Sequence, residues 1–399
     1  MSWSWLQKID SAFASWQLKR CHNINDLRRA ARLRMPSPMF HYMDGASEDE
    51  VTLKRSCGSF DDYELLPRYL TDVSEIDPST TILGEPIDFP VLCSPTGMSR
   101  LFHHDGELAV SKAAARANTV YNLSTMGTYS IEDVAAECDG LKWFQIYVFK
   151  DRGLVTEFIE RCRAAEYHAM CLTIDITAFG NRERDLRTGM TIPPKFSLAG
   201  WFDFALHPLW SLNYLANPPF SLSNVAHRVS GGSGDAVTTL VQYISGQFDR
   251  SVTWEDAAKM VQEWGGPFVM KGVMTVHDAL KAVEIGASAI MVSTHGGRQL
   301  DHTPAPIDVL PEIVAAVGNK IEVILDGGIR RGTDVLKALA LGANAVSIGR
   351  GYLFGLGAAG EAGVDRALAL LKEEIIRDMA ILGCRTIDEI NADYVRRRP

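Results

Sequence analysis

From residue 89 onward, hydrophobic residues form short continuous runs, each followed by a polar loop and usually by an amphipathic segment. A short run that is apolar at every position is typical of a parallel strand buried on both faces. The pattern predicts eight strands, at residues 89–94, 120–124, 143–147, 169–174, 268–271, 288–293, 321–326 and 344–348. It predicts helices between most of them, at residues 106–118, 130–138, 151–165, 254–264, 275–285, 307–317 and 331–341.

Eight successive β-α units favour an α/β fold of the closed (β/α)8, or TIM barrel, type. An open doubly wound sheet is the alternative, but no G-x-G-x-x-G motif follows the first predicted strand. We expect a single domain over residues 1–399. Its expected parts are an N-terminal helical and extended segment, the barrel, and a C-terminal tail, at residues 1–88, 89–378 and 379–399.

A long insertion, residues 176–253, interrupts the pattern after the fourth predicted strand. A loop of this length in a compact domain is usually functional or mobile. Two interpretations of its aromatic residues stay open: either they contact a membrane surface through residues 190–225, or they pack on the barrel or another subunit. These residues are Phe196, Trp201, Phe202, Phe204, Trp210, Tyr214 and Phe220.

Residues 1–35 predict a helix, which Pro36 and Pro38 are expected to end. One side of this helix is aromatic and apolar, with basic residues beside it. Either it docks on the domain or it lies at a membrane interface, and both interpretations stay open. The residues concerned are Trp3, Trp5, Leu6, Ile9, Phe13 and Trp16, with Lys8, Lys19 and Arg20 beside them.

Composition narrows the class of protein. A content of 46% apolar and 22% charged residues is ordinary for a globular protein with a large core. The net charge of −9 supplies no basic face for nucleic acid, so we exclude that partner. Seven cysteines without a C-x-x-C or zinc-ligand spacing predict no metal site and a reducing compartment. No signal peptide and no apolar stretch of membrane-spanning length are visible, so we expect a cytoplasmic protein.

Polar residues follow nearly every predicted strand, at the end where α/β barrels carry out their chemistry. The segment S-T-H-G-G-R-Q-L-D, residues 293–301, places His295 and Arg298 three residues apart after the sixth strand. Burying such a ring of polar groups costs free energy unless each finds a partner, so it predicts a polar, planar ligand such as a cofactor ring. Its other members are Pro95, Thr96, Gly97, Ser124, Gln145, Tyr147, Thr173, Asp175, Lys271 and Ser293.

Glycine-rich turns with arginines follow the last two predicted strands, as D-G-G-I-R-R-G at residues 326–332 and I-G-R-G at residues 348–351. Glycine lets backbone N–H groups approach an anion, a helix N-terminus adds partial positive charge, and arginine adds a charged fork. Barrels commonly bind phosphate at this place, so we predict a phosphate site here.

Together these segments resemble the FMN-dependent L-2-hydroxy acid oxidase and dehydrogenase family, which includes glycolate oxidases, L-lactate dehydrogenases and mandelate dehydrogenases. The resemblance runs from about Leu27 to about Ile390, and the segment at residues 293–301 is its most specific motif. It is supported by P-T-G-M, W-F-Q-I-Y and L-T-I-D at residues 95–98, 143–147 and 172–175, by Lys271-Gly, and by the two glycine-rich turns. It implies FMN as the cofactor, an L-2-hydroxy acid such as L-lactate or a larger, aromatic analogue as the substrate, and a homotetramer.

The resemblance also implies roles for individual residues in the reaction. His295 corresponds to the base that takes a proton from the substrate, and Asp175 to its carboxylate partner. Arg182 and Arg298 correspond to the clamp on the substrate carboxylate, and Tyr147 to a hydroxyl that bonds the substrate.

Further residues correspond to the cofactor site and to the edge of the substrate pocket. Lys271 is expected beside the edge of the flavin where reduction places negative charge. We expect His41 to line the substrate pocket and Tyr42 to serve only in packing. The flavin ring and ribityl chain are expected at Pro95, Thr96, Gly97, Ser124, Gln145, Thr173 and Ser293, and the phosphate end at Asp326, Gly327, Gly328, Arg330, Gly349 and Arg350.

Two features bear on the electron acceptor. Family members that react quickly with oxygen tend to have alanine at the position of Gly97, so glycine favours a dehydrogenase that uses a quinone or another carrier. The segment H-P-L-W-S-L, residues 207–212, resembles the corresponding segment of membrane-bound mandelate dehydrogenases. We therefore expect peripheral contact with the inner face of the plasma membrane. An oxidase that produces hydrogen peroxide is the alternative, and a non-redox phosphate-binding barrel is a remote one.

Overall fold

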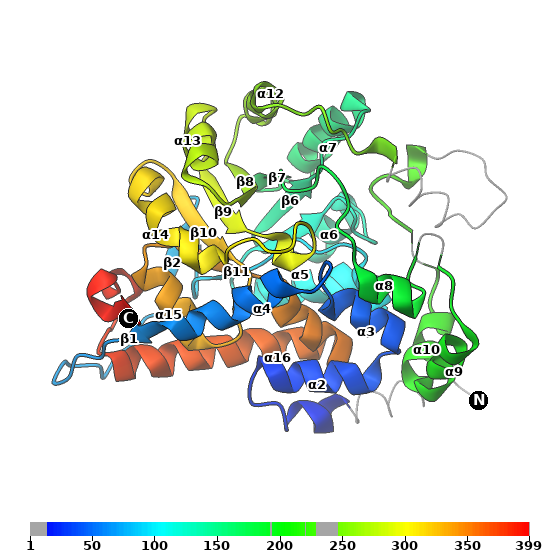
Figure 1. The fold of residues 1–399 in the computed structure, drawn as a ribbon, viewed down its shortest axis with the longest axis horizontal. Coiled ribbons are helices and arrows are strands. Elements are labelled where there is room, and N and C mark those ends of the chain that lie inside the picture. The colour runs from blue at the N-terminus through cyan, green and yellow to red at the C-terminus, as the bar shows by residue number, and fades with distance from the viewer. Residues whose placement is uncertain (1–13, 192–193, 220, 229–245, 399) are drawn as a thin grey trace.

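The computed structural model describes residues 14–191, 194–219, 221–228 and 246–398, and within them eight parallel strands close into a barrel (Figure 1). Each strand pairs with the next along the chain, and the last pairs with the first, with Val346 opposite Val91. The predicted (β/α)8 barrel is therefore confirmed. Its strands are β4 (Val91–Cys93), β5 (Tyr121–Ser124), β6 (Lys142–Ile146), β7 (Ala169–Thr173), β8 (Phe268–Val273), β9 (Ala289–Ser293), β10 (Glu322–Asp326) and β11 (Ala345–Ile348).

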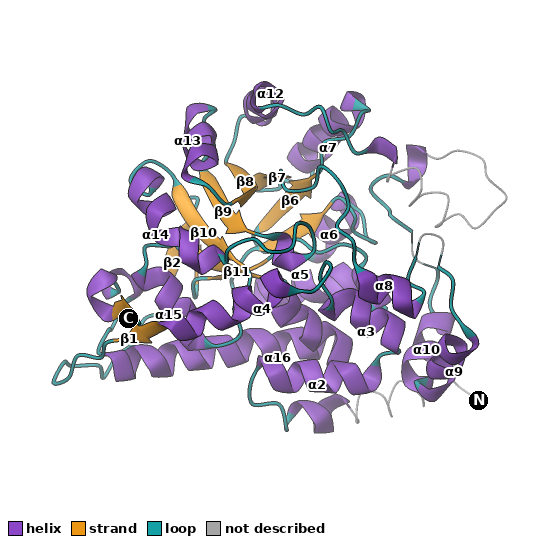
Figure 2. Cartoon of the chain, in the orientation of Figure 1, coloured by secondary structure: helices purple, strands orange, loops and turns teal. Residues whose placement is uncertain are grey.

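Helices surround the barrel, as Figure 2 shows in purple around the orange strands. Seven of them occupy the positions that the helical spacing predicted, within two residues at either end. The final helix continues to Leu382, so the predicted end of the barrel at residue 378 lies inside it. The helices are α5 (Gly106–Arg116), α6 (Ile131–Glu137), α7 (Arg152–Ala164), α12 (Trp254–Trp264), α13 (Val276–Glu284), α14 (Pro306–Val317), α15 (Gly332–Ala340) and α16 (Arg350–Leu382).

A short hairpin covers the amino-terminal end of the barrel. It consists of β2 (Thr80–Ile82) and β3 (Glu85–Ile87), which pair antiparallel. Ile82 and Ile87 are buried there in one apolar cluster with residues in or next to the barrel strands, namely Leu92, Val120, Trp143, Ala169, Cys171, Val269, Ala289, Met291, Ile324 and Ala345. Apolar side chains fill this end, so the polar loops at the opposite end are the ones that can surround a ligand.

Before the barrel the described residues include a helical stretch at residues 14–18 and the helices α2 (Ile24–Arg34), α3 (Ser37–Asp44) and α4 (Val51–Gly58). The prediction of one helix up to residue 35 is therefore wrong within the described part, because the chain turns at residues 19–22 and Asn23 caps a new helix. Helix α2 packs on α16, and α4 contacts the loop that follows β9. Pro36 and Pro38 separate α2 from α3 as predicted, but a new helix begins at once because proline is tolerated in a first helical turn. Trp16 is half exposed, whereas Trp3, Trp5, Leu6, Lys8, Ile9 and Phe13 lie outside the described residues.

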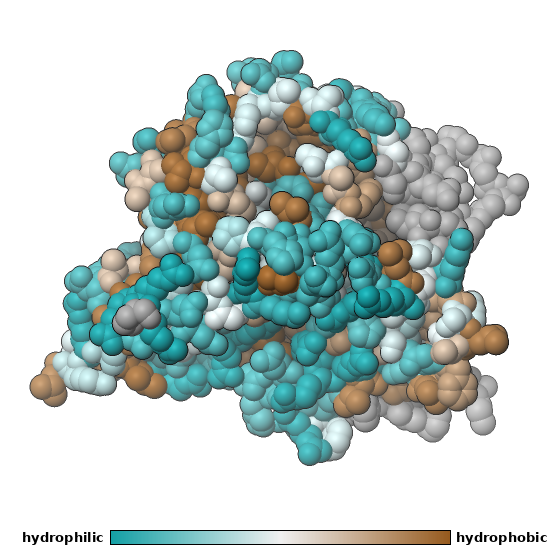
Figure 3. Space-filling model, viewed as in Figure 1, coloured by the Kyte–Doolittle hydropathy of each residue, from teal (hydrophilic) through white to brown (hydrophobic). Residues whose placement is uncertain are grey.

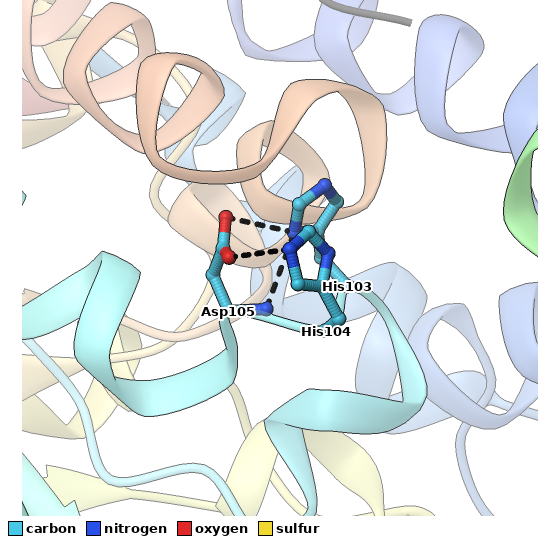
Figure 4. Close-up of side chains that lie close together, drawn as sticks. All are labelled: His103, His104 and Asp105. Atoms are coloured by element: carbon cyan, nitrogen blue, oxygen red, sulfur yellow. Dashed lines mark hydrogen bonds and ion pairs between the residues drawn. The ribbon is translucent and has the colours of Figure 1, made fainter. Parts of the chain in front are cut away.

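Helix α16 is kinked at Ala359 and Gly360, above a pair of histidines. Gly360 has φ +60°, and a Cβ there would lie 2.6 Å from the ring of His103. Figure 4 shows Asp105 facing two imidazoles, with Nδ1 of His103 at 3.1 Å and Nε2 of His104 at 2.8 Å. Lys19, Arg34 and Arg366 line the same hollow, and their positive charges oppose the binding of a cation. We therefore assign His103, His104 and Asp105 a structural role.

The insertion after the fourth barrel strand, β7, is present as predicted. Its described part contains α8 (Glu183–Thr188), α9 (Leu198–Leu206) and α10 (Pro208–Ala216), shown in green in Figure 1. Phe196 and Phe204 pack against the core and Trp210 is buried, whereas Trp201 and Phe202 are exposed. The aromatic residues therefore divide between packing and an exposed surface, and Phe220 lies outside the described residues.

Candidate active site

A cavity of about 710 Å³ opens at the carboxyl ends of the barrel strands. This volume lies within the range of small-molecule and cofactor sites. The cavity extends from the glycine turns after β10 and β11, past the loop after β9, to the aromatic residues of α9 and α10. The predicted residues that line it are Pro95, Thr96, Gly97, Tyr147, Arg182, Lys271, His295, Arg298, Asp326, Gly327, Gly328, Arg330, Gly349 and Arg350.

His295 and Asp175, which the resemblance implied to be partners, lie in direct contact. The Nδ1 atom of His295 lies 3.0 Å from Oδ1 of Asp175, which leaves Nε2 as the nitrogen available to a ligand in the cavity. The loop after β9 adopts left-handed backbone at His295, with φ +53°, and at Gly296 and Gly297. A non-glycine residue at positive φ is uncommon and concentrates at functional sites. Gly272 allows the close approach of Asp175, because a Cβ there would lie 2.8 Å from that of Asp175.

Two guanidinium groups lie on the ring of one tyrosine. The centre of the Arg298 guanidinium is 5.1 Å from the ring centre of Tyr42, and that of Arg182 is 5.2 Å away. Burial and the neighbouring Arg182 lower the pKa of Arg298. Two adjacent cations that line a cavity form an attractive site for a carboxylate. Tyr147 is buried beside them, and burial raises the pKa of its hydroxyl, which therefore remains a hydrogen-bond donor.

His41 does not line the cavity, contrary to the expectation from sequence, and Tyr42 does. Successive residues of an α-helix point about 100° apart, so α3 directs Tyr42 to the barrel mouth and His41 toward α2. The Nε2 atom of His41 is 2.9 Å from Arg32 of α2, and its ring packs edge-on against Phe40. The expectation missed Tyr42 because sequence spacing alone did not fix which face of this short helix is buried.

A buried lysine carries positive charge into the floor of the cavity. Nζ of Lys271 donates to Oδ2 of Asp326 at 2.8 Å and to Ser293 at 3.0 Å. Burial alone would lower the pKa of Lys271, but Asp326 and Asp175 raise it, so the amine stays charged. Ser94 donates to the other oxygen of Asp326 at 2.8 Å. Sequence reasoning missed Ser94, although it ends a predicted strand and the rule that identified Ser124 would have found it.

Buried polar atoms near the cavity indicate that a ligand completes the site. Nε2 of Gln145 and Oγ1 of Thr173 have no hydrogen-bond partner among the described residues. An unsatisfied buried group costs about 1–3 kcal/mol, and a ring with polar edges would satisfy such groups. Four predicted cofactor residues are buried at strand ends without lining the cavity themselves: Ser124, Gln145, Thr173 and Ser293. These features fit a flavin ring.

The opposite end of the cavity has the charge that a phosphate requires. Burial, together with Arg298 and Arg330, lowers the pKa of Arg350 to about 9. Crowding of like charges around this guanidinium makes an anion favourable here. Beside it, a Cβ on Gly327 would meet nothing within 4 Å, so there is open space next to the backbone. The residues present therefore fit the phosphate end of FMN.

A TIM barrel whose cavity fits a planar cofactor with a phosphate, next to a histidine–aspartate pair, is typical of a flavin-dependent oxidoreductase. Residues 31–397 match the family model described as FMN-dependent dehydrogenase. The chain therefore belongs to the FMN-dependent dehydrogenase family, as the sequence motifs predicted, and uses FMN.

Similar proteins support this assignment. The chain is 40% identical over 373 residues to a putative L-lactate dehydrogenase of Mycobacterium tuberculosis, covering 93% of this chain and 88% of that protein. It is 42% identical over 377 residues to an L-lactate oxidase of Nostoc, covering 94% and 97%. It is also similar to a crystal structure of the monotopic membrane protein (S)-mandelate dehydrogenase, with a TM-score of 0.91, 36% identity, and coverage of 95% of this chain and 100% of that one.

Proposed function

We propose that this FMN enzyme oxidises an L-2-hydroxy acid to the 2-oxo acid and passes the electrons to a quinone or another carrier. The main support is one arrangement: the His295–Asp175 pair, Arg182 and Arg298 all adjoin a single cavity, with the charged Lys271 in its floor. The proteins similar to this chain include enzymes named for lactate, glycolate and mandelate, all of which are 2-hydroxy acids.

Each of these residues has a defined task in the reaction. Arg182 and Arg298 bind the carboxylate of the substrate and orient its α-carbon toward His295. His295 takes a proton through Nε2, and Asp175 stabilises the imidazolium that forms. The two electrons and the second hydrogen of the substrate would go to FMN when it is bound. Lys271 stabilises negative charge that develops at the adjacent edge of the site.

The cavity leaves room for a substrate larger than lactate. Beyond the arginines its lining becomes aromatic, with Phe196, Trp201, Phe204, Trp210 and Tyr214. Neighbouring rings of this group stack, tilt or meet edge to face at centroid distances of 5.0–5.8 Å. We propose that these residues receive either an aromatic substrate side chain or a lipophilic electron acceptor.

One anaerobic experiment tests the reaction and the acceptor in sequence. The yellow protein is mixed with lactate, with mandelate and with a longer aliphatic 2-hydroxy acid, each as its L and D forms. Only the L forms are expected to bleach the flavin. The reduced protein is then mixed with oxygen or with a short-chain quinone, and the quinone is expected to restore the colour faster. Flavin that no 2-hydroxy acid bleaches would contradict the proposal.

Rapid recovery with oxygen and production of peroxide would instead favour the second candidate, an L-2-hydroxy acid oxidase. The similarity to the L-lactate oxidase of Nostoc supports this candidate. Gly97 does not exclude an oxidase, because close packing against Met126 is enough to explain a glycine at this position. A Cβ on Gly97 would lie 2.7 Å from that of Met126.

We propose that α9 and α10 attach the protein to the inner face of the plasma membrane. Figure 3 shows hydrophobic residues in brown over these helices, at the lower right of the view. Five large apolar or aromatic residues of these two helices are at least 61% exposed: Leu198, Trp201, Phe202, Leu206 and Leu215. Among the described residues no helix is long and apolar enough to cross a bilayer, so the proposed contact is peripheral. The homotetramer implied by the family resemblance also remains a proposal, to be tested by light scattering of the solubilised protein.

Replacing Trp201 and Phe202 together with serine is expected to release the protein from lipid vesicles. Each aromatic ring carries about 150–250 Å² of surface, so losing two of them should weaken partitioning at least tenfold. Sedimentation with phosphatidylcholine and phosphatidylglycerol vesicles measures this. Leu300→Ser is the control, because the side chain of Leu300 is at least as exposed as those of Trp201 and Phe202 but lies in the loop after β9. Equal sedimentation of the double variant and the wild type would contradict membrane attachment through this surface.

A further inference from the structure

Asp185 is a buried carboxylate next to the proposed substrate site, and it has no role in the reaction described above. It lies in α8, three residues after Arg182, and is only 4% exposed. Its Oδ2 atom is 3.2 Å from Nε of Arg182. Neither carboxylate oxygen has a well-aligned hydrogen bond within the described residues. Burying a charge without hydrogen bonds costs free energy. The neighbouring charges must therefore offset the cost of burying Asp185.

The two guanidinium groups at the substrate site are held in different ways. Arg298 donates to the backbone carbonyls of Tyr42 at 2.7 Å and of Gly45 at 3.3 Å, which fixes its position. Arg182 contacts the ring of Tyr42 and the carboxylate of Asp185. Arg182 also repels Arg298, because both cations lie on the same ring. Asp185 supplies the anion that offsets this repulsion.

The surrounding charges support the same view. Burial raises the pKa of Asp185, while Arg182, Arg298 and Arg184 act against that rise. Arg184 itself is committed elsewhere, since it forms an ion pair with Asp44 of α3 at 3.0 Å. Arg182 is therefore the arginine in direct ion-pair contact with Asp185.

We propose that Asp185 is a positioning residue that holds the guanidinium of Arg182 beside Arg298 before the substrate arrives. With Asp185 ionised, the three side chains carry a net charge of about +1, which one substrate carboxylate neutralises. Without it, two cations would share one ring with no anion between them, and Arg182 would move toward solvent. This inference rests on the proposed role of Arg182 in binding the substrate carboxylate.

The expected effect of Asp185→Asn is weaker binding of carboxylates with chemistry largely intact. KM for the 2-hydroxy acid should rise about tenfold, while kcat changes less than about threefold. A general loss of structure would instead lower kcat and FMN content together. Glu183→Gln is the matched control, because Glu183 lies in the same helix and loses the same charge but pairs with the exposed Arg187. It should behave as the wild type does.

A binding measurement without turnover tests whether Asp185 acts on carboxylate binding through Arg182. Oxalate is titrated by calorimetry into the FMN-loaded wild type, Asp185→Asn, Arg182→Met and the double variant. Asp185→Asn should weaken oxalate binding about tenfold in the wild-type background and less than about twofold once Arg182 is absent, because a positioning residue acts through its partner. Should Asp185→Asn fail to fold, Asp185→Ser takes its place in the same comparison.

Unchanged oxalate binding by the Asp185 variant would overturn the inference, as would a full tenfold loss that persists without Arg182. A wild type that does not bind oxalate would also overturn it. If the wild type binds oxalate but no 2-hydroxy acid bleaches its flavin, the proposed function fails, and the comparison of variants still decides the role of Asp185.

Discussion

Replacing His295 with alanine is expected to abolish reduction of the flavin by 2-hydroxy acids while FMN stays bound. The variant loses the one imidazole that is paired with Asp175 and lines the cavity. A positioned general base contributes roughly 10²–10⁴-fold to a rate, so reduction should slow by at least that factor. Stopped-flow absorbance under anaerobic conditions measures the reduction.

Controls separate this effect from damage to the site. FMN content should stay at the wild-type level, because the predicted contacts of the cofactor lie on other residues. Asp175→Asn should slow reduction less than His295→Ala, since it leaves the imidazole present and removes only the carboxylate that orients it. Reduction of His295→Ala at the wild-type rate would refute the assignment of the base.

Replacing Lys271 with methionine is expected to lower the reduction potential of the flavin and to weaken FMN binding. The ammonium group is buried at the carboxyl end of β8 and lines the cavity, where it would favour the reduced, negatively charged ring. About 30 mV corresponds to 1.4 kcal/mol for a two-electron couple, so a shift of several tens of millivolts is expected. Redox titration and dialysis against buffer measure the two effects.

The same substitution should also destabilise the fold, because Asp326 would keep a buried charge without its cation. Breaking a buried pair in this way typically costs about 3–5 kcal/mol. Adding Asp326→Asn should recover part of that stability without restoring the potential. Lys281→Met is the control, as Lys281 lies on the surface of α13 and pairs with Glu284. An unchanged potential in Lys271→Met would argue against contact with the flavin.

The barrel could be predicted from sequence because its strands are buried on both faces and therefore read as continuous apolar runs. Residues 169–173 are all buried, and the fourth predicted strand, 169–174, differs from β7 by one residue. The helices of the insertion were not predicted. Their aromatic residues face both the core and the surface, so they show no clear helical period.

The network in the cavity floor could not be predicted in full. Ser94, Lys271 and Asp326 come from three strands, with 232 residues separating Ser94 from Asp326. Only closure of the barrel brings these strands together. The motifs identified Lys271 and Asp326 separately, but not their contact. His41 shows the same limit at short range, since one step along α3 decides which side chain faces the cavity.

The β2–β3 hairpin has a consequence for the order of events in each turnover. Ile82 and Ile87 plug the far end of the barrel with hydrocarbon, so within the described chain molecules enter and leave at the rim near Arg182. The 2-oxo acid and the incoming oxidant must then pass through the same opening of the cavity. Unless the two can share the aromatic part of the cavity, the acid departs before the oxidant docks, and the enzyme alternates between two half-reactions.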